Sequence, residues 1–62
     1  MCESIVYLIE KTEEPFMRDV IFVNVEGNQI KLRDIMGVEK IVYGEIVKID
    51  FINHALFIRE RS

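Results

Sequence analysis

Short apolar runs alternate with polar turn signals along this chain, at a spacing of about eight to twelve residues that is typical of small β-sandwiches and barrels. The first run, Cys2–Glu10, is rich in Ile, Val and Tyr, which favour an extended backbone. Its apolar side chains fall on both faces, as in a strand that is covered on both sides. A polar segment closed by Pro15 follows it. We therefore predict a β-strand over Cys2–Glu10.

The second run, roughly Arg18–Glu26, alternates in the same way, with Val20 and Phe22 on one face and further apolar residues on the other. The segment Glu26–Gln29 is a tight-turn signal, because Gly and Asn tolerate the positive φ that hairpin turns need. After it, Ile30–Arg33 alternates strictly, which places its two aliphatic residues inward and its two bases outward. Together these segments predict a β-hairpin.

The second half of the chain predicts two further strands. Asp34–Val38 contains a glycine and predicts a turn or one irregular helical loop. Glu39–Phe51 is a long strand pattern interrupted at Gly44, and glycine inside a strand usually marks a bulge or a bend at a barrel corner. Asn53–His54 supplies the next turn, and Ala55–Arg59 is the last predicted strand.

No segment shows a sustained helical period, and no linker or repeat divides the chain. Five short, bent, antiparallel strands in 62 residues indicate an all-β fold, a small SH3-like barrel. We predict a single domain over residues 1–62.

Composition changes this picture in one respect. Half of the residues are hydrophobic, which is near the upper end for a soluble domain. A chain this short buries only part of its surface, so its core cannot hold all of these side chains. The remainder must lie outside or meet a second copy of the chain, and we therefore expect a homodimer.

The sequence offers almost no combination of residues that could form a catalytic site. The chain has one histidine and one cysteine, and no local spacing places His54 beside Cys2 as the base that a cysteine nucleophile needs. The carboxylates fall on turns and outward faces, where solvated charge is usual. We expect no enzyme activity, because the acid, base and stabilising roles lack candidates.

Charge argues against a polyanion partner. Eight basic residues are scattered among eleven acidic ones, and the net charge is −3. Nucleic-acid binders usually show a basic balance or a basic cluster. Two alternatives stay open. One is an RNA-binding small β-barrel that uses a face with Lys31, Arg33 and Lys48, and the other is a protein-interaction module that uses an exposed strand edge.

The single cysteine cannot form an internal disulfide, which favours a reducing compartment. The start of the chain, Met1–Ser4, lacks the basic region and long apolar run of a signal peptide. The longest apolar stretch, Ile5–Ile9, is too short to cross a bilayer. We therefore expect a cytoplasmic protein.

Cys2 is the candidate metal ligand. Its side chain is small, so we expect Met1 to be trimmed, which leaves Cys2 with a free α-amine beside its thiol. Amine and thiolate close a five-membered ring on a metal, and the amine with a deprotonated Glu3 amide nitrogen closes another. This nitrogen and sulfur set suits square-planar Ni(II) or Cu(II). Thiolate tends to reduce Cu(II) and Zn(II) prefers a tetrahedron of side chains, so nickel is favoured.

One chain provides too few ligands, so two copies that meet near their N-termini would complete the nickel site. Simpler interpretations stay open beside this one. A lone cysteine such as Cys2 is most often a small buried hydrophobe. His54 is more often an ordinary turn or surface residue than a metal ligand.

Several segments, in this order, carry a family resemblance. These are Met1-Cys2 leading into Ile5-Val6-Tyr7, the turn Val25–Asn28, the stretch Leu32–Gly37, and the C-terminal segment Tyr43–His54. In this arrangement the chain resembles the CooT family, small nickel-binding proteins associated with maturation of carbon monoxide dehydrogenase.

The resemblance implies an SH3-like dimer in which the N-terminal cysteine carries the nickel site. By this resemblance the role of nickel ligand is assigned to Cys2 and not to His54. We therefore expect a nickel-binding accessory protein that delivers or stores the metal, with a nickel enzyme as its client.

Overall fold

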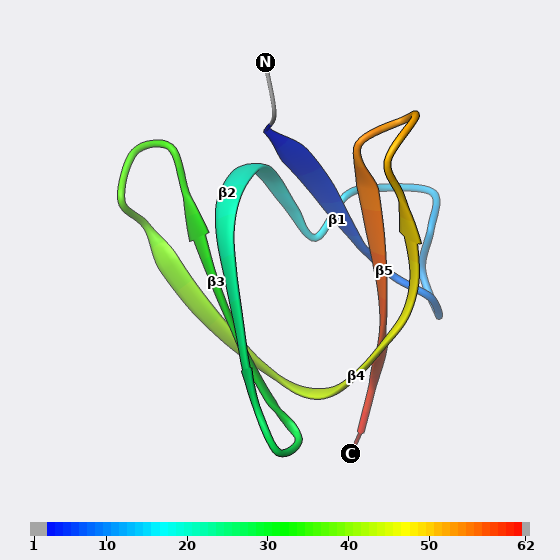
Figure 1. The fold of residues 1–62 in the computed structure, drawn as a ribbon. Helices are drawn as coiled ribbons and strands as arrows, with labels where there is room; N and C mark the ends of the chain where they lie inside the picture. The colour runs from blue at the N-terminus through cyan, green and yellow to red at the C-terminus, as the bar shows by residue number, and fades with distance from the viewer. Residues whose placement is uncertain (1–2, 62) are drawn as a thin grey trace.

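The computed structural model describes residues 3–61, and within them the chain forms a closed five-stranded β-barrel without a helix (Figure 1). The strands are β1 (Ser4–Leu8), β2 (Met17–Glu26), β3 (Gln29–Asp34), β4 (Glu39–Asp50) and β5 (Ala55–Glu60). All five predicted strands are present, so the prediction of a small all-β, SH3-like barrel is confirmed. The first strand is shorter than predicted, because a turn begins directly after Leu8. Cys2 lies outside the described residues.

The barrel closes between its first and last strands. Strands β2 to β5 each run antiparallel to the strand that precedes them in the chain. By contrast, β1 and β5 pair in parallel, from Ile5 opposite Ala55 to Leu8 opposite Ile58. The prediction of antiparallel strands throughout is therefore wrong at this pair. In a ring with an odd number of strands, strict alternation of direction must leave one parallel contact.

The long strand β4 turns a barrel corner at Gly44. Up to Tyr43 this strand pairs with β3, and from Gly44 onward it pairs with β5 (Figure 1). The Gly44 amide donates a hydrogen bond of 2.8 Å to the Asn28 carbonyl. A Cβ atom at this position would collide with the backbone carbonyl of Arg59, so only glycine fits. The predicted corner at Gly44 is confirmed.

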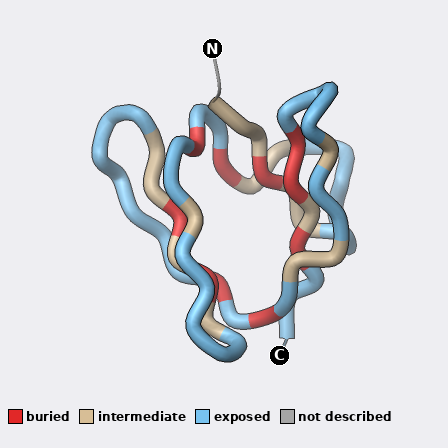
Figure 2. Tube along the Cα trace, viewed as in Figure 1, coloured by how far each residue is buried: buried red, intermediate tan, exposed pale blue. Residues whose placement is uncertain are grey.

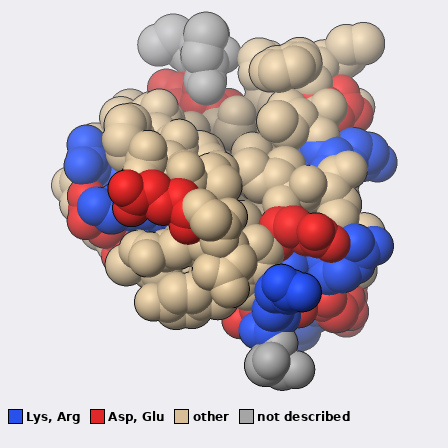
Figure 3. All heavy atoms as spheres, turned by 60° about the horizontal axis from the view of Figure 1, so that its bottom comes forward, with Lys and Arg blue, Asp and Glu red and all other residues tan. Residues whose placement is uncertain are grey.

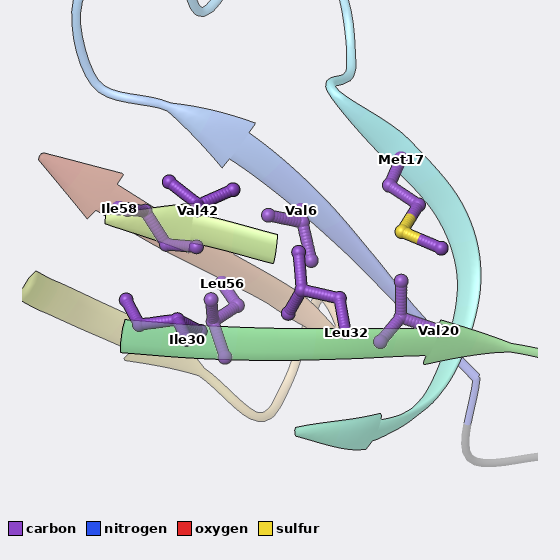
Figure 4. Close-up of a cluster of buried hydrophobic side chains, with 8 residues drawn as sticks. All are labelled: Val6, Met17, Val20, Ile30, Leu32, Val42, Leu56 and Ile58. Carbon is purple, nitrogen blue, oxygen red and sulfur yellow. The ribbon is translucent and has the colours of Figure 1, made fainter. Parts of the chain in front are cut away.

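The core is aliphatic and small, and its side chains come from all five strands (Figures 2 and 4). The buried cluster consists of Val6, Met17, Val20, Ile30, Leu32, Val42, Leu56 and Ile58. The inward placement predicted for Ile30 and Leu32 is confirmed, since both are fully buried.

The prediction that Val20 and Phe22 share a face is wrong. Val20 is buried, but the register of β2 against β3 shifts between these two residues, which is a β-bulge. The extra residue turns Phe22 outward, where the Arg33 guanidinium carbon lies 4.6 Å from the centre of its ring. Strict alternation therefore ends at this bulge.

Twelve large hydrophobic residues of the described chain remain exposed. They are Ile9, Ile21, Phe22, Val25, Ile35, Met36, Val38, Ile41, Tyr43, Ile49, Phe51 and Ile52. The core indeed cannot hold all the apolar side chains, as the composition predicted.

Replacing Gly44 with alanine tests the barrel corner. We expect Gly44→Ala to lower the free energy of unfolding by about 3 kcal/mol, because the new methyl group is forced against a backbone carbonyl that cannot move aside. Urea unfolding followed by circular dichroism measures the change. Gly27→Asn is the matched control, because the φ of 60° there suits asparagine and the site is open. Equal losses in the two variants would contradict this account of the corner.

Candidate functional site

The turn between β4 and β5, residues 51–54, lies directly beside the start of β1. The Ile5 amide donates a 2.8 Å hydrogen bond to the His54 carbonyl, next to the point where Ile5 pairs with Ala55. His54 has a φ of 53°, a left-handed conformation that histidine tolerates better than most residues. His54 is exposed and holds β1 through its backbone. Its interpretation as a turn residue on the surface is confirmed.

Asp50 fixes the shape of this turn. Its Oδ1 accepts hydrogen bonds from the amides of Ile52, at 3.0 Å, and Asn53, at 3.1 Å, while its Oδ2 accepts one of 2.9 Å from the Asn53 side-chain amide. These hydrogen bonds, with that from the Asn53 side chain as the largest cause, hold the pKa of Asp50 below its ordinary value. The turn is thus ordered by one carboxylate, yet it presents Phe51 at 80% and Ile52 at 89% exposure.

The loop between β3 and β4, residues 35–38, lies on the other side of the start of β1. The Ile35 amide donates a 2.9 Å hydrogen bond to the Asp19 carbonyl. Asp19 immediately precedes Val20, which pairs with Ser4 of β1. The loop and the turn therefore flank the first residues of β1, at the end of the barrel where β1 begins (Figure 1).

Asp34 organises this loop as Asp50 organises the turn. Its Oδ1 accepts hydrogen bonds of 2.9 Å from the amides of both Met36 and Val38. At the base of the loop, Arg33 Nη2 lies 2.7 Å from a Glu39 carboxylate oxygen. The side-chain hydrogen bond from Arg33 is the main cause that lowers the pKa of Glu39. Both ends of the loop are therefore held.

The loop and the turn together present five exposed apolar side chains, which we call the apolar rim: Ile35, Met36, Val38, Phe51 and Ile52. Sequence reasoning missed this surface, because Asp34–Val38 was predicted as a turn or irregular loop and Phe51 as the end of a strand. The two segments are also separated by the 12 residues of β4. A signal was available, since each segment is an aspartate followed by two large apolar residues, where turns usually carry small or polar ones.

Of the two residues predicted to hold a metal, Cys2 lies outside the described residues. Glu3 is half-buried and directly precedes β1, between the loop and the turn. Within residues 3–61, no three His, Cys, Asp or Glu side chains gather as a metal site. The structure therefore describes the strand that follows the two predicted metal ligands.

A shallow open hollow lies elsewhere, at the ends of β1 and β5. Its lining residues are Leu8, Glu10, Lys11, Glu13, Glu60 and Arg61. Charged side chains dominate this lining, and Lys11 is already paired with Glu14 at 3.0 Å. Binding sites for small molecules enclose most of their ligand, whereas this hollow is open to solvent and so lacks their usual character.

The three bases of the RNA alternative do not share one strand pair. Lys31 and Arg33 project from β3, whereas Lys48 lies beyond the Gly44 corner, 4.4 Å from the Phe57 ring centre of β5. Basic and acidic groups lie next to one another in the view of Figure 3. The geometry therefore does not favour a continuous basic face there.

These observations define a class of protein, a small closed β-barrel whose first strand begins between two apolar loops. Residues 1–59 match the family model described as CO dehydrogenase accessory protein CooT. The chain therefore belongs to the CooT family, a family of carbon monoxide dehydrogenase accessory proteins, as its resemblance indicated.

A curated relative is consistent with this membership. An uncharacterized protein of Archaeoglobus fulgidus is 36% identical over 42 residues, which are 68% of this chain and 93% of that protein. Membership of a family of accessory proteins indicates a non-catalytic role. Within the described residues there is no helix that is long and apolar enough to span a membrane.

The Asp50 turn predicts a pH dependence of stability. Its pKa is lower in the folded chain than the ordinary 3.8, so its contribution is fully present above pH 3.8 and is lost as the pH falls through the lowered value. We expect Asp50→Asn, which keeps an accepting oxygen but no charge, to reduce the slope of unfolding free energy against pH in this acid range. Urea titrations from pH 2 to 6 measure it, and identical slopes would refute the role of Asp50.

Proposed function

We propose that this chain is a nickel-binding accessory protein that delivers nickel to, or stores it for, a carbon monoxide dehydrogenase, and that two copies hold one nickel ion through paired Cys2 residues. The accessory role rests on family membership over residues 1–59. The observation that supports the nickel site is the position of the sole cysteine. It lies two residues before β1, a strand that pairs with β2 on one side and with β5 on the other.

The chemistry of the N-terminus supports nickel as cargo. After removal of Met1, Cys2 offers an α-amine and a thiolate in one five-membered ring, and the Glu3 amide nitrogen adds a second ring. Such ligands suit a square-planar ion such as Ni(II). Two copies would together offer two thiolates, two α-amines and two Glu3 amide nitrogens, from which the four donors of a square-planar ion can be drawn. In this proposal Glu3 acts through its backbone nitrogen rather than through its carboxylate.

The barrel supports this arrangement by fixing the backbone that follows the ligands. Ser4 pairs with Val20 on one side, and the Ile5 amide bonds to the His54 carbonyl on the other. A ligand attached to an ordered strand loses less conformational freedom when the metal binds. The short distance in sequence from Cys2 to this anchored segment therefore favours a preorganised site.

Nickel titration tests the role of Cys2. We expect the chain whose mass confirms loss of Met1 to develop a thiolate-to-nickel charge-transfer band that saturates at one metal per dimer. Cys2→Ser should bind nickel at least about a hundredfold more weakly, because it lacks the thiolate. Ultraviolet absorbance and calorimetry measure both. Equal affinity in the parent and the variant would refute the proposal.

Extending the chain at its N-terminus tests the amine. We expect one additional residue before Cys2, confirmed by mass, to weaken nickel binding at least about tenfold, because the α-amine then belongs to another residue and the amine-thiolate ring is lost. The same extension after Ser62 is the control and should leave the affinity unchanged. Nickel binding that survives the N-terminal extension would show that the thiol alone suffices.

A further inference from the structure

One side of β2 has no neighbouring strand beyond Val20 within the described residues. Strand β1 pairs with β2 only between Met17 and Val20, whereas β3 pairs with the other side of β2 as far as Glu26. We propose that the segment Ile21–Glu26, which we call the open edge, binds an extended segment of a partner protein as an added β-strand. The bound segment is uncharged in its middle and basic at its ends.

The backbone of the open edge has hydrogen-bonding groups to offer. In an antiparallel pair, alternate residues turn their amide and carbonyl groups toward the partner strand, and the residues between them turn theirs away. The pairing of β2 with β3 is regular from Phe22 to Glu26, so this alternation runs along most of the open edge. Outside the strand pairs, no backbone hydrogen bond within residues 3–61 involves these residues. An added strand would therefore find unused donors and acceptors.

The open edge also lacks the side chains that usually protect a free strand. Natural edge strands carry lysine, proline or inward-pointing charges, or contain a bulge. Ile21–Val25 has no charged residue, no proline and no glycine, and all of its side chains except Asn24 are β-branched or aromatic. The bulge between Val20 and Phe22 lies at the start of this segment, and the pairing beyond it is regular. Such an edge is a template for pairing with another chain.

The start of β4 shows the protection that β2 lacks. Glu39–Tyr43 pairs with β3 on one side, and β5 joins β4 only from Gly44 onward. This segment carries two charged residues, Glu39 and Lys40. The Tyr43 carbonyl also accepts a 2.8 Å hydrogen bond from the Arg61 amide. The two outer strands of this three-stranded part of the barrel therefore differ, and only β2 presents an uncharged edge.

The charges around the open edge define the bound segment. A charged group placed against Ile21–Val25 would lose water without gaining an ionic partner, so the middle of the bound segment is uncharged. Asp19 and Glu26 are exposed on either side of this stretch, and neither belongs to an ion pair of the described residues. Both carboxylates favour basic ends on the bound segment. Arg18 lies next to Asp19, so Glu26 gives the stronger preference.

The course of the open edge leaves the proposed nickel site accessible. It runs from Val20, which pairs with Ser4, toward the β2–β3 turn at the opposite end of the barrel from the start of β1 (Figure 1). A segment bound along it lies on the side of the barrel. The inference is therefore independent of nickel, and it adds a way to hold a client protein while the metal is bound.

Titration with a short peptide tests the open edge. The probe is acetyl-Lys-Thr-Val-Thr-Val-Thr-Lys-amide at millimolar concentration, followed by the amide resonances of the labelled chain. We expect the largest shifts in Ile21–Glu26. Val25→Lys should weaken binding at least about tenfold, because it places a charge on the edge, where Val25 is 51% exposed. Ile9→Lys is the matched control, since Ile9 is 41% exposed and lies outside β2, and it should bind as the parent does.

Reversing a charge tests the preference for basic ends. We expect the parent to bind the lysine-flanked peptide more tightly than the same peptide flanked by glutamate, and Glu26→Lys to show the opposite order. A peptide with proline in place of one valine should not bind to any variant, because it lacks a ladder donor. An unchanged order in Glu26→Lys would refute the assigned charge of the bound segment.

The remaining outcomes decide the inference directly. Absence of shifts in the open edge, or equal affinity in Val25→Lys and the parent, overturns it. Shifts in the open edge that grow with protein concentration alone assign this edge to a second copy of the chain and also overturn it. Circular dichroism confirms the fold of each variant, and Ile21→Lys replaces Val25→Lys if the latter is unfolded. Cys2→Ser should bind the peptide as the parent does, so a failure of the nickel proposal remains distinguishable.

Discussion

The parallel pairing of β1 with β5 is the contact on which the rest of the structure depends. It closes the ring, and closure is what allows so few aliphatic side chains to form a core that is shielded on all sides. The same pairing brings the β4–β5 turn against Ile5, and so fixes the end of the barrel from which the chain continues to Cys2. Stability and the setting of the proposed metal site therefore share one strand pair.

Small size explains why so much apolar surface remains outside. The core takes branched aliphatic residues and Met17, and every aromatic ring of the described chain stays at least partly exposed. Some rings find local partners, as Tyr7 and Phe57 do with ring centres 5.3 Å apart. The rim residues stay at least half exposed, although hydrogen bonds to Asp34 and Asp50 order their backbones.

Periodicity predicted most of the fold, because strand alternation and turn residues are local properties. The five strands, the inward pair Ile30 and Leu32, and the corner at Gly44 could all be predicted this way. The bulge after Val20 could not, because it depends on how β2 meets β3. The metal ligands were proposed from covalent chemistry at Cys2 and from a family resemblance. The apolar rim could not be predicted locally, because it depends on the placement of two distant segments on either side of β1.

The paired aspartates Asp34 and Asp50 have a consequence for how such proteins diversify. Each carboxylate shapes its segment by bonding to backbone amides, and these are present whatever the side chains are. The apolar residues that follow can therefore change over evolutionary time without altering the curve of the chain that displays them. Relatives that keep both aspartates can acquire new binding preferences while the barrel beneath stays the same, which separates selection on recognition from selection on folding.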